Sequence, residues 1–393
     1  MKRRALLLAL PALLARPVRA QADRVVMLVD AATRAQLAGG RGGDVAGPGI
    51  AWTISDTPYD RALRDAGLGV GSYDLALLPH HLVTPRAAAL FLPVEEAAAD
   101  IPAALRRAFT LEGRLHGLPF AQVTQALFRN TAITGDTPPP ATAAALLAAC
   151  RAALGRRADG QVIAGLVADG PELAFDLARL WDGDVIGPGL ALRVTEPGMI
   201  RALEALAALF AEGVLPRTLP RFMPADALRE MQAGRGAWAM APFARHEWLN
   251  RPGASRDAGR IEASLIPGAE GGAAPVTVAL RALVVPRNAP NPDAAMRALR
   301  RLGGAEEAVR AGLNGIGPAR LSALSDPRYV AATPWAAAEA AALRVARPAL
   351  PPFAQAARAD GIIRAEVEAM LVRPRTPSET AERIAFRLRP LLA

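Results

Sequence analysis

Short apolar runs alternate with stretches of helical periodicity along most of the chain. The run at residues 24–29 (RVVMLV) is almost continuously apolar, as expected for a parallel strand that is covered on both faces. Further runs predict strands at residues 49–54, 74–78, 162–167, 237–240, 262–266 and 276–285. Strands that alternate with helices in this way predict the α/β class.

Two helices carry clear boundary signals. Residues 195–213 place apolar side chains on one face, and Gly213 follows the last of them. The final helix opens with Thr376-Pro377-Ser378-Glu379, a capping box that satisfies orphan backbone N–H groups at a helix start. The chain has 393 residues, and 52% of them are hydrophobic. A chain of this length is longer than one hydrophobic core usually organises. We therefore expect two lobes.

The first residues predict export. Lys2, Arg3 and Arg4 precede an apolar run at residues 5–14, and small residues for cleavage follow near Ala20 and Ala22. The run is shorter than the roughly 20 apolar residues that span a bilayer. We expect a signal peptide over residues 1–20, ordinary secretion as the default route, and a periplasmic product. No cysteine lies near the cleavage site to carry a lipid.

The net charge and the lysine, cysteine and histidine content exclude several functions. The formal charge of +9 falls to 9 − 5 = +4 without the five basic residues of segment 1–20, and no basic tract remains to suggest a nucleic-acid partner. Lys2 is the only lysine, so Schiff-base and P-loop chemistry are excluded from the mature chain. Cys150 is alone and is expected to be buried, and the four histidines form no HxH or HxxxH pair. The sequence predicts no metal and no cofactor.

The segment Glu112–Asn130 (EGRLHGLPFAQVTQALFRN) joins Gly-Leu-Pro at residues 117–119 to an apolar run that ends in Phe-Arg-Asn. It resembles the segment where the extracellular solute-binding proteins of bacterial carbohydrate importers, family 1, cross between their two lobes. Similar motifs follow the family's order at residues 71–78, 91–95, 137–142, 227–240 and 266–291. The step at residues 137–142 lacks the family's Lys and Trp.

This resemblance implies a two-lobe periplasmic binding protein of type II. Each lobe is then a mixed sheet flanked by helices, and the ligand cleft lies between the lobes. The implied lobes are residues 21–119 with 276–316, and 120–275 with 317–393, with crossings near 118–124, 276–283 and 316–319. The implied function is that of a monomer without enzymatic activity. It captures a carbohydrate or related polyhydroxylated solute by lobe closure and delivers it to an inner-membrane ABC permease.

A sugar site needs aromatic plates and planar polar side chains. Trp181, Trp238 and Phe243 are candidate plates in the second lobe, and a core position is the alternative for each tryptophan. Trp52 and Trp335 are expected to serve packing. Candidate polar contacts follow Pro119 and end the strand at residues 74–78, where capping of strand ends is the alternative. These polar candidates are Gln122, Thr124, Gln125, His80 and His81.

Arg281 interrupts an apolar strand, where the family often carries Gly-Trp. An unpaired charge there would be costly, so Arg281 either pairs with an acid such as Asp74 or points into the cleft. The second case favours an anionic non-sugar solute, such as a uronate or a phosphodiester. A rival interpretation is a secreted glycosidase, for which Asp56, Tyr59 and Asp74 are candidates. No Ser/His/Asp or metal signature supports an enzyme.

Overall fold

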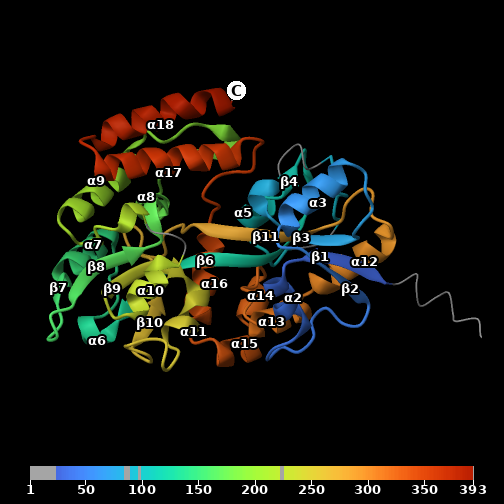
Figure 1. The fold of residues 1–393 in the computed structure, drawn as a ribbon, viewed down its shortest axis with the longest axis horizontal. Helices are drawn as coiled ribbons and strands as arrows, with labels where there is room; N and C mark the ends of the chain where they lie inside the picture. The colour runs from blue at the N-terminus through green and yellow to red at the C-terminus, as the bar shows by residue number, and fades with distance from the viewer. Residues whose placement is uncertain (1–23, 84–88, 96–98, 222–224, 393) are drawn as a thin grey trace, which may run out of the picture.

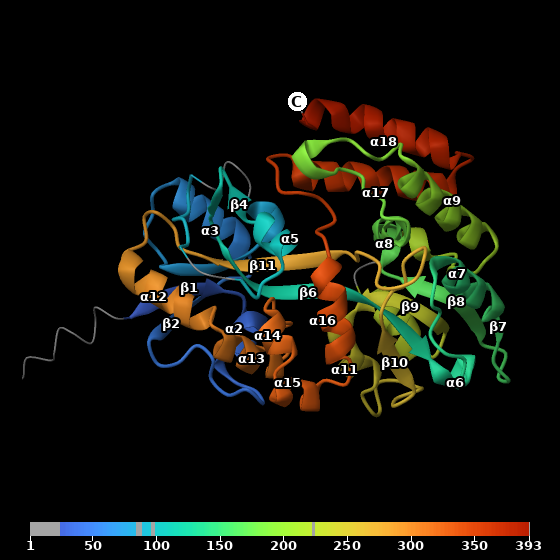
Figure 2. The same ribbon diagram turned by 180° about the vertical axis from the view of Figure 1, so that it is seen from behind.

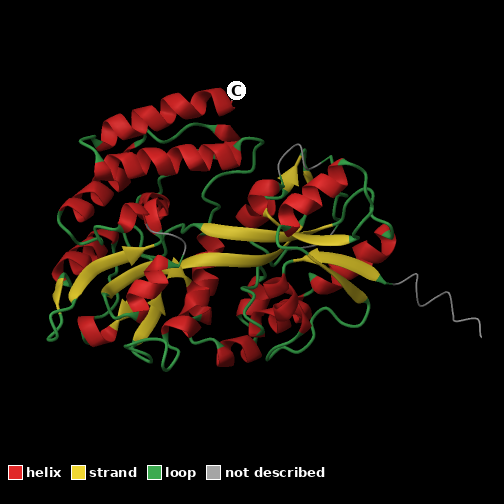
Figure 3. Ribbon diagram, in the orientation of Figure 1, coloured by secondary structure: helices red, strands yellow, loops and turns green. Residues whose placement is uncertain are grey.

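The computed structural model describes residues 24–83, 89–95, 99–221 and 225–392. The α/β class is confirmed, because helices flank both halves of a mixed sheet (Figures 1 and 3). The seven runs predicted as strands at the outset form β1 (Val25–Val29), β2 (Ile50–Ile54), β3 (Leu75–Pro79), β8 (Val162–Ala168), β9 (Gly236–Pro242), β10 (Ile261–Ser264) and β11 (Val278–Val284). The signal peptide and its cleavage site lie outside the described residues.

One nine-stranded sheet runs through the molecule. Its strand order is β2-β1-β3-β11-β6-β9-β8-β7, with β10 paired to β6. The longest strand, β6, covers Leu118–Asn130, while β7 is only Gly155–Arg156. β1, β2 and β3 are mutually parallel, and β8 is parallel to β9. A separate two-stranded sheet joins β4 (Thr110–Leu111) to β5 (Arg114–Leu115).

Three segments lie side by side where the two halves of the sheet meet. β6 pairs with β11 over its first part and with β9 over its second part. On the edge of β6 opposite β11, Ala121 pairs with Pro318, and the Gln122 N–H donates to the Gly317 carbonyl at 2.8 Å. A Cβ on Gly317 would lie 2.4 Å from the Gln122 carbonyl oxygen, so only glycine fits. The lobe boundaries expected from the sequence stay a prediction.

Helices cover both faces of each half. Figures 1 and 2 show α2 (Ala31–Ala38), α12 (Pro292–Leu302) and α13 (Ala305–Leu313) on one side of β1, with α3 (Pro58–Gly67) and α5 (Ala103–Arg107) on the other. In the other half, α8 (Leu173–Leu180), α9 (Pro197–Ala211), α17 (Ala356–Val372) and α18 (Pro377–Leu392) form one layer. α16 (Ala336–Val345) packs on β6. The shorter helices are α6 (Thr131–Thr134), α7 (Ala143–Ala152), α10 (Asp226–Gln232), α11 (His246–Leu249), α14 (Leu321–Leu324) and α15 (Pro327–Ala332).

The helix boundaries follow the sequence signals. The predicted capping box is confirmed, because the Thr376 N–H donates to Glu379 Oε2 at 2.8 Å and the Glu379 N–H donates to Thr376 Oγ1 at 3.2 Å. The helix predicted before Gly213 is confirmed as α9. Cys150 is fully buried on α7, as expected.

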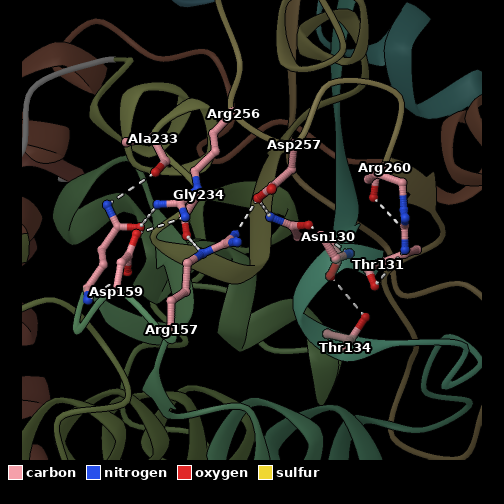
Figure 4. Close-up of polar contacts among 12 residues, drawn as sticks. Asn130, Thr131, Thr134, Arg157, Asp159, Ala233, Gly234, Arg256, Asp257 and Arg260 are labelled. Carbon is pink, nitrogen blue, oxygen red and sulfur yellow. Dashed lines mark hydrogen bonds and ion pairs between the residues drawn. The ribbon is translucent and has the colours of Figure 1, made fainter.

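A polar network fixes the end of β6 (Figure 4). The Asn130 side chain caps α6 by accepting from the Ala132 N–H at 3.1 Å, and its Nδ2 donates to Asp257 Oδ2 at 2.7 Å. Arg157 also donates to Asp257, and to the Gly234 carbonyl at 2.8 Å. Asn130, the last residue of the crossing motif, is therefore a structural anchor of the second half of the sheet.

Within the part of the chain that the structure describes, no helix has the length and apolarity needed to cross a membrane. Nor do three His, Cys, Asp or Glu side chains of these described residues come together as a metal-ion site would require.

Candidate functional site

The paired strands β6 and β11 have two unlike faces. Successive residues of a strand point to opposite faces, and directly paired residues of antiparallel strands share a face. Val123 pairs with Ala279, and Thr124 pairs with Val278. The residues on one face of the paired strands are partly or fully exposed, and those on the other face are buried. The open face consists of Val123, Gln125, Thr277, Ala279 and Arg281, and the closed face consists of Gln122, Thr124, Val278 and Leu280.

The closed face carries a buried hydrogen-bond network with α15 and α16. Gln122 Nε2 donates to Glu339 Oε1 at 2.6 Å, and the Tyr329 hydroxyl donates to Glu339 Oε2 at 2.9 Å. The Thr124 hydroxyl donates to Gln122 Oε1. Burial raises the pKa of Glu339 despite these hydrogen bonds. Gln122 and Thr124, two predicted ligand contacts, thus have their side chains engaged inside the protein.

Arg281 lies on the open face, next to the end of β1. Its Nη1 lies 3.4 Å from the Thr33 hydroxyl oxygen. Burial alone would raise the pKa of Asp30, but hydrogen bonds from Thr33 and the nearby charge of Arg281 bring it below its usual value. Among the described residues, no carboxylate oxygen lies within 4.0 Å of an Arg281 nitrogen. The suggested pairing with Asp74 is wrong, because Asp74 instead accepts from the N–H groups of Val26 and Asn291.

The carboxyl ends of β1, β2 and β3 meet at one edge of the sheet, where open α/β sheets present ligand contacts. Asp30, Asp56, Tyr59 and His81 line a hollow of about 450 Å³ at this edge. His80, by contrast, is buried, and burial together with neighbouring His81 lowers its pKa to about 4. His81 therefore lines the hollow, whereas the buried ring of His80 does not.

The hollow at β1, β2 and β3 forms one wall of the candidate site. The carboxyl ends of β8 and β9 form the second wall. Arg245, just past β9, donates from Nη2 to Asp169 Oδ2 at 2.7 Å, and Asp169 follows β8 directly. Gln125 pairs with Pro242, the last residue of β9, and its N–H donates to the Thr277 carbonyl at 3.3 Å. These contacts bring the open face next to the ends of β8 and β9.

Asp176 of α8 borders the same region. Its side chain is buried, and this burial raises its pKa to about 7, against the opposing effect of the Thr277 hydroxyl. The charge of Arg179 also lowers this pKa, whereas the neighbouring charge of Asp169 raises it. A carboxyl group with this pKa exchanges between hydrogen-bond donor and acceptor near neutral pH.

Four buried polar side-chain atoms around this wall lack hydrogen-bond partners among the described residues. One is the Thr277 hydroxyl oxygen, and the other three are Gln125 Oε1, Asp176 Oδ1 and Arg245 Nη1. A buried polar group without a partner costs about 1–3 kcal/mol, so such groups are uncommon in folded proteins. Two acceptors, one donor and the Thr277 hydroxyl in one region suit the hydroxyl groups of a solute, each of which donates and accepts. We refer to Gln125, Asp176 and Arg245 as the polar triad.

The predicted aromatic plates are positioned differently from the polar triad. Trp238 is 1% exposed on β9, between Leu166 of β8 and Arg129 of β6, and its Nε1 has no partner among the described residues. Phe243 is also buried, whereas Trp181 is half-buried at the end of α8. Tyr59 is the aromatic residue among those lining the hollow at β1–β3. Ligand contact by Trp181, Trp238 or Phe243 stays a prediction.

Sequence reasoning missed Asp30, Asp169, Asp176, Arg245 and Thr277. For Asp30 and Asp169 a signal was present, because each is the first polar residue after a predicted apolar strand. For Asp176 and Arg245 the signal was weaker, since both stand within helical segments whose orientation only the packed structure defines.

The sequence profile of the family described as bacterial extracellular solute-binding protein matches residues 64–341, more than half of the chain. The chain belongs to this family, which confirms the resemblance seen at residues 112–130. A search of curated proteins finds no match.

Many solved structures share the fold, and three of them serve as examples. The maltose-bound MalE3 of T. maritima has a TM-score of 0.76 at 20% identity, with 94% of this chain and 99% of that chain covered. A solute-binding protein of Thermotoga lettingae TMO bound with α-D-tagatose has a TM-score of 0.72 at 20% identity, covering 88% and 93%. A solute-binding protein of Agrobacterium radiobacter K84 in complex with ribitol has a TM-score of 0.70 at 16% identity, covering 87% and 90%. The fold is that of the two-lobe periplasmic binding proteins.

Proposed function

We propose that this chain is the periplasmic solute-binding component of an ABC importer. In this proposal a carbohydrate or related polyhydroxylated solute binds between the two lobes, and the loaded protein delivers it to an inner-membrane permease. Family membership supports the solute-binding role. The maltose, tagatose and ribitol bound by proteins of the same fold support the solute class.

The observation that carries the solute class is the polar triad on the wall at β8 and β9. Gln125 Oε1 and Asp176 Oδ1 accept hydrogen bonds, and Arg245 Nη1 donates one. Solute hydroxyl groups would supply the partners these atoms lack. Across the open face, Asp30, Tyr59 and His81 offer a second set of polar groups to the other side of the same solute.

A thermal-shift panel of sugars, sugar alcohols and uronates tests the proposal. We expect a rise in melting temperature with at least one neutral polyhydroxylated compound, because a ligand that binds only the folded state stabilises it. Incubation with oligosaccharides, followed by product analysis, runs alongside. Turnover would support the glycosidase instead, and a panel without any shift would contradict the solute class.

Lobe closure is part of the proposal. Three adjacent segments connect the halves of the sheet, an arrangement suited to a hinge, and a solute that contacts both walls binds the closed form better. Small-angle scattering with and without saturating solute should show a smaller radius of gyration in the bound state. An unchanged radius would contradict closure.

An anionic solute is the second candidate, and Arg281 favours it. Its guanidinium group lies on the open face, and within the described residues it has no ion-pair partner that would occupy it. A planar guanidinium binds a carboxylate or phosphate through two parallel hydrogen bonds. A uronate or phosphodiester that shifts the melting temperature more than the matching neutral sugar would support this candidate.

A further inference from the structure

The C-terminal half of α18 gathers arginines around an exposed aromatic ring. Phe386 is 73% exposed, and Arg383, Arg387 and Arg389 are exposed beside it. Arg358 of α17 lines one hollow together with Phe386, Arg387 and Arg389. We refer to Arg358, Arg383, Phe386, Arg387 and Arg389 as the basic patch.

Two arginines of this patch and their neighbour Arg375 outnumber the buried carboxylate that they contact. Three arginines converge on Glu366, which is 3% exposed. Arg383 Nε lies 2.9 Å and Arg387 Nη1 2.7 Å from its carboxylate oxygens, and Arg375 pairs with it as well. Burial alone would raise the pKa of Glu366, but the hydrogen bonds from the arginines lower it to about 2. A single carboxylate thus neutralises one of three permanent positive charges.

The remaining charges leave the surplus in place. Among the described residues, neither Arg358 nor Arg389 has a carboxylate oxygen within 4.0 Å. The acids that line the neighbouring hollow are Glu379 and Glu382, and Glu379 caps the start of its own helix. Both stand in the first half of α18, so the charged side chains that its second half exposes are Arg387 and Arg389.

The position of α18 suits a flat partner. It lies on the outside of the molecule and packs on α17 and α9 (Figures 1 and 2). The exposed ring and the arginines beside it stand on this outer helix, where an extended anionic surface can reach them together. Basic helices with exposed aromatic residues bind at the interface of anionic membranes, where arginines meet phosphate groups.

We propose that the basic patch binds the phosphate headgroups of anionic phospholipids, an inference that rests on the proposed function only in taking the importer's membrane as the surface concerned. The contact holds the protein weakly at the membrane that carries the permease. Phe386 enters the headgroup region, and the arginines bind the phosphates around it. The open cleft takes no part in this contact.

Co-sedimentation with lipid vesicles tests the inference. At low salt, we expect the protein to sediment with vesicles of phosphatidylglycerol and phosphatidylcholine in equal parts, and to stay in solution with phosphatidylcholine alone. Arg358→Gln with Arg389→Gln should lower the partition coefficient by on the order of tenfold, since each arginine near an anionic surface contributes separately. Phe386→Ser should lower it severalfold, and about 1 M salt should abolish binding.

Arg114→Gln with Arg344→Gln is the matched control, because both arginines are exposed outside the patch. This control should bind the vesicles as the unaltered protein does. Equal sedimentation with both vesicle types, or a patch variant that binds like the control, would overturn the inference. So would retention on immobilised polyglutamate without vesicle binding, which would assign the patch to an acidic protein surface. Solute-induced melting shifts, measured on the same variants, report the proposed function separately and should stay unchanged.

Discussion

Each face of the paired strands β6 and β11 carries a glutamine, but one face is buried and the other is partly exposed. Gln122 and Gln125 are three residues apart on one strand, and both are amides with the same hydrogen-bonding capacity. Gln122 is 2% exposed and donates to Glu339, whereas Gln125 is partly exposed and its Oε1 has no partner in the described part of the chain. Residue type alone therefore does not distinguish the two environments, but the face of the strand does.

Trp238→Ala gives the largest expected effect. The sequence placed Trp238 among the ligand contacts, but the structure buries it in the sheet, so it should behave like a closed-face residue. The substitution should cost about 3–5 kcal/mol of unfolding free energy, as large-to-small changes in cores do. Denaturant unfolding and calorimetric solute titration on the same variant separate the two roles. Lost affinity at unchanged stability would support Trp238 as a ligand contact instead.

Asp176→Asn tests the candidate site through the pH dependence of the unfolding free energy. The folded-state pKa of Asp176 is raised to about 7 from 3.8, mainly by burial, so its contribution to stability is full below pH 4 and is lost as pH rises through 7. An asparagine does not titrate. The variant should therefore match the wild type at acidic pH and exceed it by about 4 kcal/mol at pH 8, the size that such a pKa difference implies. Denaturant unfolding at both pH values measures this, and parallel pH profiles would refute it.

Arg281→Gln tests the open face with charge. If the solute is anionic, affinity should fall by roughly one to two decades, at about 1.4 kcal/mol per decade. Its salt dependence should weaken as well, since one attractive charge is gone. Neutral sugars should bind nearly as before. Calorimetric titration with a uronate and its neutral sugar compares them, and equal losses for both would point to a structural role beside Asp30.

The strands and the last helix could be predicted because their signals are local. A continuous apolar run such as residues 24–29 and a capping box such as Thr376–Glu379 need no distant partner. The family motif at residues 112–130 also indicated the crossing strand. Which side of that strand would be covered was not local, because α16 arrives from more than 200 residues away in the chain, as the Gln122–Glu339 hydrogen bond shows.

The candidate site was predicted less completely for the same reason. Three of the predicted residues lie on the open face or in the hollow at β1–β3, namely Gln125, Arg281 and His81. Three others are buried, namely Gln122, Thr124 and His80. The alternation of side chains along β6 explains why Gln122 and Thr124 face inward. The polar triad combines side chains from β6, α8 and the segment after β9. Their meeting depends on the packing of the whole sheet, which the sequence pattern does not state.

The most direct test measures Gln125→Ala and Gln122→Ala side by side, each for unfolding free energy and for affinity toward the solute found by thermal shift. Gln125→Ala should weaken binding about tenfold and leave stability nearly unchanged, because its amide faces the solute in the proposed site. Gln122→Ala should cost about 1–2 kcal/mol of stability and leave affinity nearly unchanged, because it removes a donor to a buried carboxylate. The reverse pattern, with affinity lost at Gln122 and stability lost at Gln125, would contradict the assignment of the open face as the solute site.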